Sequence, residues 1–197
     1  MKNNIRLKGL ICISLLLFLL PFLQTCSDKR LKNSPDYKVR FNSYIINTEK
    51  TREEVVLDTT KIKETEKEKK AKEIWLEKAQ KDNTVNAYFL GFAGYSNFKI
   101  KDLNDKQFYV LSIFTIIIIL TIVMLVLSFR KKVKQIIILS SINLILLAIA
   151  TISLCLIEVV EDFKQIKYGY YLFIVNSIVI IIESRKELNR KTLEKTD

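Results

Sequence analysis

The stretch FYVLSIFTIIIILTIVMLVLSFRKKVK, residues 108–134, decides how the rest of the chain can be arranged. Its first 22 residues contain no charged residue, no glycine and no proline. At about 1.5 Å per residue such a helix is roughly 33 Å long, which is enough to cross the hydrocarbon core of a bilayer. The basic run that follows marks the cytoplasmic side of the membrane by the positive-inside rule.

The charged residues of the chain are confined to a few segments that alternate with uncharged ones. The chain has 32 Lys and Arg and 21 Asp and Glu among its 197 residues, and none lies in four segments: 9–26, 108–129, 135–157 and 168–182. A soluble protein with 27% charged residues is not expected to leave four such gaps. We therefore expect an all-α integral membrane protein with four transmembrane helices, the third over 136–157 and the fourth starting near Tyr168.

Residues 1–26 predict either a signal-anchor helix or a cleaved signal peptide. Three basic residues among the first eight precede an apolar run of about 14 residues, short for a span and typical of a signal-peptide core. The sequence LQTC at 23–26 resembles the lipobox of bacterial lipoproteins, and this resemblance makes Cys26 a lipidation candidate. Gln24 and Thr25 stand where that motif usually has small residues. Cleavage would leave three transmembrane helices, whereas an uncleaved helix would place Cys26 at the outer interface.

The short flanks of the apolar segments predict the orientation, because long domains translocate largely regardless of charge. The three proposed cytoplasmic flanks hold 3, 4 and 5 Lys or Arg residues, while the short outer loop 158–167 holds 2. We expect both termini in the cytoplasm of a bacterium if the first helix is uncleaved. Residues 27–107 are then extracytoplasmic, 108–183 form a three-helix transmembrane bundle in the inner membrane, and 184–197 are a cytoplasmic tail.

Within the extracytoplasmic region, the residues up to 60 read as a flexible or partly ordered linker. Residues 61–82 predict an exposed helix, since they are strong helix formers with Glu–Lys pairs at i,i+4 spacing. Its thin apolar face consists of Ala71, Ile74, Trp75 and Ala79. Trp75 is the candidate partner contact on this otherwise charged helix.

Residues 84–98 form an aromatic segment that follows the charged helix. If helical, one face would hold Val85, Tyr88, Phe89, Phe92 and Ala93. Aromatic residues suit the headgroup region of a membrane. The segment lies on the outer leaflet, packs against the spans, or forms the small core of an extracytoplasmic domain.

The side-chain chemistry of the chain argues against an enzyme. The sequence has no His, three isolated Cys and four Gly, so neither a zinc motif nor a phosphate-binding loop can be read from it. We expect no cofactor and no metal site. Nucleic acid is not expected as a partner either, because the basic residues of the long soluble region are mixed with Glu.

Two asparagines lie inside the apolar spans, Asn143 and Asn176. Counting residues places both about 10 Å from the cytoplasmic boundary. An amide that faces lipid is costly, so we expect both to face the bundle interior and to pair or share one polar partner. The alternative is that each bonds separately to a backbone carbonyl or to a hydroxyl such as Ser140 or Ser177.

The architecture favours an accessory, interaction or immunity-type protein of the bacterial envelope. Its expected partners are the lipid bilayer and another membrane or envelope protein, or a second copy of the chain. The rival hypothesis is a subunit of an oligomeric channel or pore, lined by Ser112, Thr115 and Thr121. Such hydroxyls more often bond to the backbone of their own helix.

Overall fold

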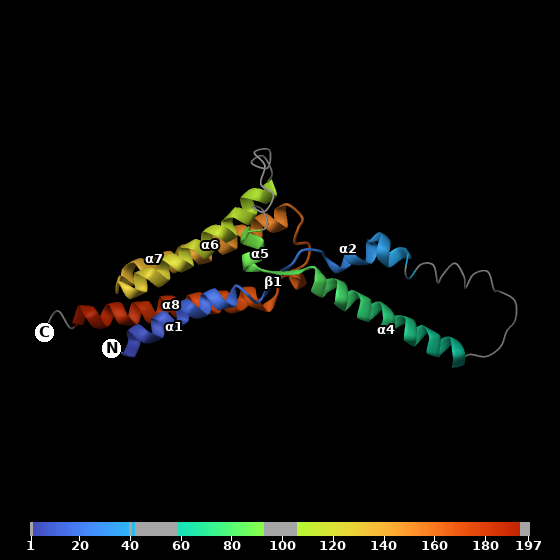
Figure 1. The fold of residues 1–197 in the computed structure, drawn as a ribbon, viewed down its shortest axis with the longest axis horizontal. Helices are drawn as coiled ribbons and strands as arrows, with labels where there is room; N and C mark the ends of the chain where they lie inside the picture. The colour runs from blue at the N-terminus through green and yellow to red at the C-terminus, as the bar shows by residue number, and fades with distance from the viewer. Residues whose placement is uncertain (1, 40, 42–58, 93–105, 194–197) are drawn as a thin grey trace. The chain divides into compact units, whose positions relative to one another are not determined.

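The computed structural model describes residues 2–39, 41, 59–92 and 106–193, and most of these are helical (Figure 1). The chain divides into two compact units. Residues 1–23 and 85–197 form the first, which we call the bundle unit, and residues 24–84 form the second, the hairpin unit. Strands β1 (Pro21–Gln24) and β2 (Thr84–Asn86) pair in a two-stranded sheet, and the boundary between the units falls within both strands.

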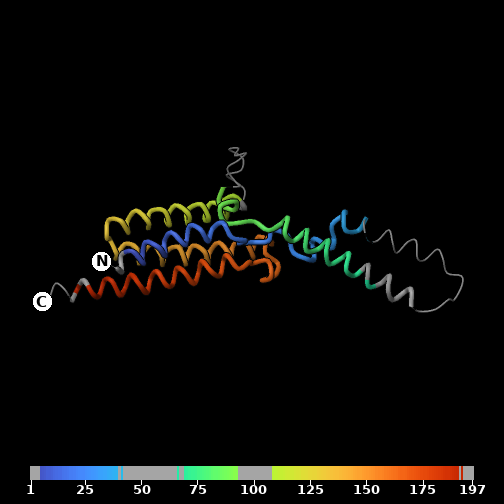
Figure 2. Tube along the Cα trace, turned by 60° about the horizontal axis from the view of Figure 1, so that its bottom comes forward, coloured from blue at the N-terminus to red at the C-terminus, as the bar shows by residue number. Residues whose placement is uncertain are grey.

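Four long helices build the bundle unit: α1 (Lys2–Leu17), α6 (Lys106–Phe129), α7 (Val133–Leu156) and α8 (Tyr168–Leu193). They lie side by side, and each packs against two neighbours in the order α1–α6–α7–α8 (Figure 2). The ammonium group of Lys8 lies 4.3 Å from the ring centre of Phe129, so the start of α1 meets the end of α6. The helices α1 and α6 are therefore antiparallel.

Two helices among the described residues are long and apolar enough to cross a membrane, Phe108–Phe129 and Val133–Leu156. The second and third predicted spans are thereby confirmed as helices of sufficient length and apolarity. The helix α1 has 16 residues, and α8 continues without a break from its apolar part through the charged residues predicted as a tail. The apolar parts of α1 and α8 are thus shorter than those of α6 and α7.

An aromatic cluster fills the bundle unit where α1 ends and β1 begins. Phe18 and Phe22 are each 1% exposed. The ring of Phe18 lies 4.7 Å from that of Phe173 on α8, and the ring of Phe22 lies 6.2 Å from that of Phe114 on α6. The segment that joins α1 to β1 therefore supplies core side chains to two other helices.

The short helix α5 (Ala87–Phe92) packs closely against α6. A Cβ atom on Gly91 would lie 3.3 Å from the backbone nitrogen of Thr115, whose hydroxyl donates to the Gly91 carbonyl. The buried residues of α5 are Ala87, Leu90 and Gly91. The missing side chain of Gly91 allows the backbones of α5 and α6 to approach closely at this point.

The single aromatic face predicted for 84–98 is divided in the structure, with two of its residues packed against the bundle and two exposed. Phe89 is 58% exposed, Phe92 is also exposed, and Val85 lies in β2 rather than in a helix. Val85 and Tyr88 pack against the bundle core, and the Tyr88 hydroxyl donates to the Leu15 carbonyl at 3.0 Å. Packing against a span was one of the three expected placements, and α5 adopts it; Ala93 and the remainder of the segment lie outside the described residues.

The hairpin unit contains α2 (Asp28–Asn33), a helical stretch at 35–39, and α4 (Thr59–Asp82). The helix α4 covers the helix predicted over about 61–82. Of the region predicted as a flexible or partly ordered linker, residues 28–33 and 35–39 are helical, and Ser27 caps α2 by accepting a hydrogen bond from the Arg30 backbone at 3.2 Å. Residues 42–58 of the predicted linker lie outside the described residues.

Candidate functional site

The described polar side chains inside the bundle unit form a layer of hydrogen bonds between helices. Asn143 on α7 is 2% exposed, and its amide donates to the Thr121 hydroxyl on α6 at 3.1 Å. The sulfur of Met124 lies 3.7 Å from the same amide nitrogen. Thr121 in turn donates to the carbonyl of Ile117 in its own helix at 2.8 Å. This chain of contacts ties α7 to α6.

The second asparagine of the layer is bound to the first helix. Asn176 on α8 is 9% exposed, and its amide donates to the Leu10 carbonyl at 2.9 Å and to the Ser14 hydroxyl at 2.7 Å. Between the two asparagines, the Ser140 hydroxyl donates to the Ser177 carbonyl at 3.1 Å. Hydrogen bonds of the layer thus join α6 to α7, α7 to α8, and α8 to α1.

The predicted pairing of Asn143 with Asn176 is wrong, although both side chains face the interior as expected. Each bonds separately to a hydroxyl or carbonyl group, which is the alternative arrangement, with Thr121, Leu10 and Ser14 as the partners. Counting residues along a helix gives depth in the bilayer but not the side of the helix on which a residue lies. The count could therefore not show that Asn143 faces α6 whereas Asn176 faces α1.

One acceptor of the layer is unsatisfied. The Oδ1 atom of Asn143 is buried and accepts no hydrogen bond from the described residues. A buried amide oxygen without a donor costs free energy because it has lost its contact with water. The hydrogen bonds of the layer connect neighbouring helices, which indicates a structural role.

The hydroxyls proposed to line a pore bond to backbone carbonyls instead. Ser112 donates to Phe108 at 2.8 Å and Thr121 to Ile117, both within α6. Thr115 donates to Gly91 on α5. Two of the three follow the pattern of hydroxyls that bond to their own helix.

Cys26 is half-buried between β1 and α2. Its two unusual neighbours have structural partners: Gln24 is buried and donates to the Cys26 carbonyl at 2.6 Å, and the Thr25 backbone donates to the Asn83 carbonyl at 2.9 Å. The residues that depart from the lipobox pattern are thus those that fix the local backbone. Cys26 stays a lipidation candidate in only one of the two alternatives that the sequence leaves open, the cleaved signal peptide.

Trp75 belongs mainly to the core of the hairpin unit. Its ring lies 5.2 Å from that of Tyr37 and 6.3 Å from that of Phe41. Ile74, which was placed on the same apolar face, is 67% exposed. The expected apolar face is therefore corrected: Trp75 and Ala79 are half-buried, whereas Ala71 and Ile74 are exposed.

A pocket of about 410 Å³ opens beside Trp75, at the ends of α2 and α4. Its lining combines an indole with two exposed carboxylates, those of Asp36 and Asp82, and with the ammonium group of Lys78. The remaining lining residues are Leu31, Ser34, Ala79 and Asn83. Sequence reasoning identified Trp75 but missed the carboxylates, because Asp36 and Asp82 are far apart along the chain.

The described residues contain no group of three or more His, Cys, Asp or Glu side chains that could hold a metal ion. No protein-family model matches the chain, and comparison with curated proteins and with solved structures yields no significant match.

Proposed function

We propose that this chain is a non-enzymatic integral membrane protein of the bacterial inner membrane with four transmembrane helices. Its hairpin unit lies on the extracytoplasmic side and binds a basic segment of another envelope protein. The observation that carries the membrane assignment is the large number of apolar side chains exposed on the outer surface of the bundle unit, in addition to those in its core.

All four long helices expose apolar side chains on the outside of the bundle unit. These include Ile13 and Leu16 on α1, Ile119 and Val126 on α6, Ile145 and Ile152 on α7, and Val175 and Ile178 on α8. Each of these is at least 45% exposed. In water such surfaces would cost about 25 cal/mol per Å² of apolar area, whereas lipid tails cover them without this cost. The helices α1 and α8 thus expose the same kind of apolar outer surface as α6 and α7.

The interior of the bundle unit supports a structural rather than a catalytic role. Ser140, Asn143 and Asn176 donate to hydroxyl or carbonyl groups of neighbouring helices. Such bonds contribute about 0.6 kcal/mol on average between membrane helices. They stabilise the arrangement of helices and leave recognition to the hairpin unit.

The pocket beside Trp75 favours a basic side chain as the contact from the partner. Asp36 and Asp82 would pair with an Arg or Lys head group, and the face of the Trp75 ring attracts a cation. Lys78, also in the lining, disfavours a second cation nearby. The partner is therefore expected to insert one isolated basic residue rather than a polybasic run.

The proposed orientation predicts the accessibility of three positions to a membrane-impermeant thiol reagent. In a cysteine-free background, cysteine at position 69 should react in intact cells once the outer envelope is permeable. Cysteine at positions 132 and 191 should react only after the inner membrane is opened. Reaction of position 69 from the cytoplasmic side would overturn the topology.

Partner binding is tested by photo-crosslinking from the pocket in the full-length membrane protein. A benzophenone residue at position 78, which lines the pocket, should give a discrete adduct, and the double change Asp36→Asn and Asp82→Asn should reduce its yield at least tenfold. The same probe at the exposed position 70 of α4 is the matched control.

A yield that the double change leaves intact, or an equal adduct from position 70, would contradict the assigned contact. The adduct should also be lost when the basic residue of the partner found at the crosslink is changed to Ala. The rival pore function predicts instead an ion leak in liposomes that contain the purified protein alone.

A further inference from the structure

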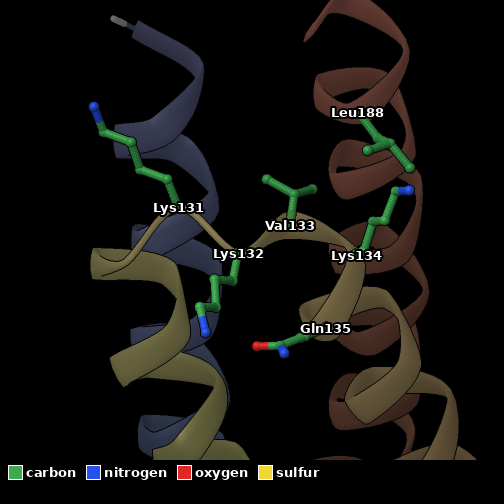
Figure 3. A pocket seen from close by; sticks show the side chains of 6 residues that line it. All are labelled: Lys131, Lys132, Val133, Lys134, Gln135 and Leu188. Atoms are coloured by element: carbon green, nitrogen blue, oxygen red, sulfur yellow. The ribbon is translucent and has the colours of Figure 1, made fainter. Parts of the chain in front are cut away.

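A second pocket, of about 320 Å³, lies at the turn between α6 and α7. It is lined by Lys131, Lys132, Val133, Lys134, Gln135 and Leu188 (Figure 3). Three of these six side chains are cationic and none is acidic. The exposed Arg130 immediately precedes them.

The backbone of the turn holds these side chains in place. Lys131 has a φ of 57°, in the left-handed region, and the Lys132 backbone donates to the Leu127 carbonyl at 3.1 Å. This arrangement ends α6 and starts α7 within a few residues, as a left-handed residue commonly does at a helix C-terminus. Lys132 is the N-cap of α7, and its side chain makes no capping hydrogen bond. The partial positive charge of the α7 N-terminus therefore adds to the lysine charges.

The pocket combines a polar part with an apolar part. Figure 3 shows the polar ends of Lys132 and Gln135 directed into the same space between the end of α6 and the first turn of α7, while Lys134 lies next to Leu188 of α8. Val133 is buried, and Leu188 is half-buried. The nearest acidic residue along α8, Glu187, is buried and is paired with Arg190 at 3.0 Å.

We propose that this pocket binds the headgroup of an anionic phospholipid, with the phosphodiester between the Lys132 ammonium and the Gln135 amide. Lys134 provides additional attraction, and Val133 and Leu188 supply the apolar part of the lining. The proposal rests on the membrane orientation given above, which puts the turn at the cytoplasmic leaflet. A basic residue near that surface strengthens binding of anionic lipid about fivefold.

The test uses the full-length purified protein in detergent and measures bound lipid by native mass spectrometry. Short-chain phosphatidylglycerol should bind at least tenfold more tightly than phosphatidylcholine of the same chain length. Lys132→Gln should weaken phosphatidylglycerol binding about fivefold. Gln135→Leu should weaken it severalfold although the net charge is unchanged, which separates a built site from general attraction. Lys70→Gln on α4 removes the same charge elsewhere and should have no effect.

Equal binding of the two lipids, or equal effects of Lys70→Gln and Lys132→Gln, would overturn the site. Competition by millimolar inorganic phosphate as strong as that by the lipid would also overturn it, because the pocket would then hold any phosphate. These outcomes leave the thiol-accessibility test unaffected. Failure of the lipid site is therefore distinguishable from failure of the proposed topology.

Discussion

The protein isolated from membranes is expected to keep its first 25 residues and to carry no lipid on Cys26. Side chains from this segment are core residues of the bundle unit: Ile11 is 0% exposed and Phe22 1%. Asn176 finds both of its hydrogen-bond partners, Leu10 and Ser14, in the same segment. Loss of one buried Phe alone costs about 3–5 kcal/mol in soluble cores, so loss of the whole segment exceeds the stability of a typical domain.

Intact-mass measurement decides this point. The retained chain should have the mass of the full sequence, 23.0 kDa, and Cys26→Ser should change neither the chain length nor the labelling by radioactive palmitate. A mature chain that begins at Cys26 with a lipid adduct would contradict the expectation. A separately expressed chain that begins at Ser27 should fail to give a cooperative melting transition in detergent, whereas the full chain gives one.

Gly169→Ala is expected to lower the stability of the bundle unit by about 1–3 kcal/mol or more. A Cβ atom at this position, in the first turn of α8, would lie 2.6 Å from the Pro21 carbonyl oxygen and 3.0 Å from the Leu20 Cβ. A backbone carbonyl cannot move aside as the end of a flexible side chain can. The helix α8 must shift away from β1, which also disturbs the nearby hydrogen bond from the Lys167 backbone to the Phe22 carbonyl at 3.0 Å.

The matched control is Gly9→Ala on α1. No atom lies within 4 Å of a Cβ built on Gly9, and the residue is exposed in a helix. Alanine should therefore stabilise this helix by about 0.5–1 kcal/mol. Melting temperatures measured in one detergent should move in opposite directions for the two variants. A Gly169→Ala protein as stable as the parent would show that α8 does not approach β1 as closely as described.

Residue counting predicted two helices long and apolar enough to span a membrane, α6 and α7, because length and charge-free composition are local properties of the sequence. The apolar run 108–129 and the basic residues that follow it can be recognised from the local sequence alone. The helix α6 ends at Phe129, where the apolar run ends. The level of Asn143 and Asn176 followed from the same counting, as the contact of Ser140 with Ser177 illustrates. Charged residues avoid lipid wherever they lie in the chain, so their absence marks a span directly.

The partners within the fold required the tertiary structure, since they join residues that are distant in the sequence. Asn176 and Ser14 are separated by 162 positions, and no local pattern indicates that they meet. The contact of Gly91 with α6 and the grouping of Tyr37, Phe41 and Trp75 depend in the same way on how helices rotate about their axes. Sequence composition by itself determined which segments are apolar and free of charged residues. Close packing between helices decided which face each segment turns inward, because rotation about a helix axis is set by the side chains of its neighbours.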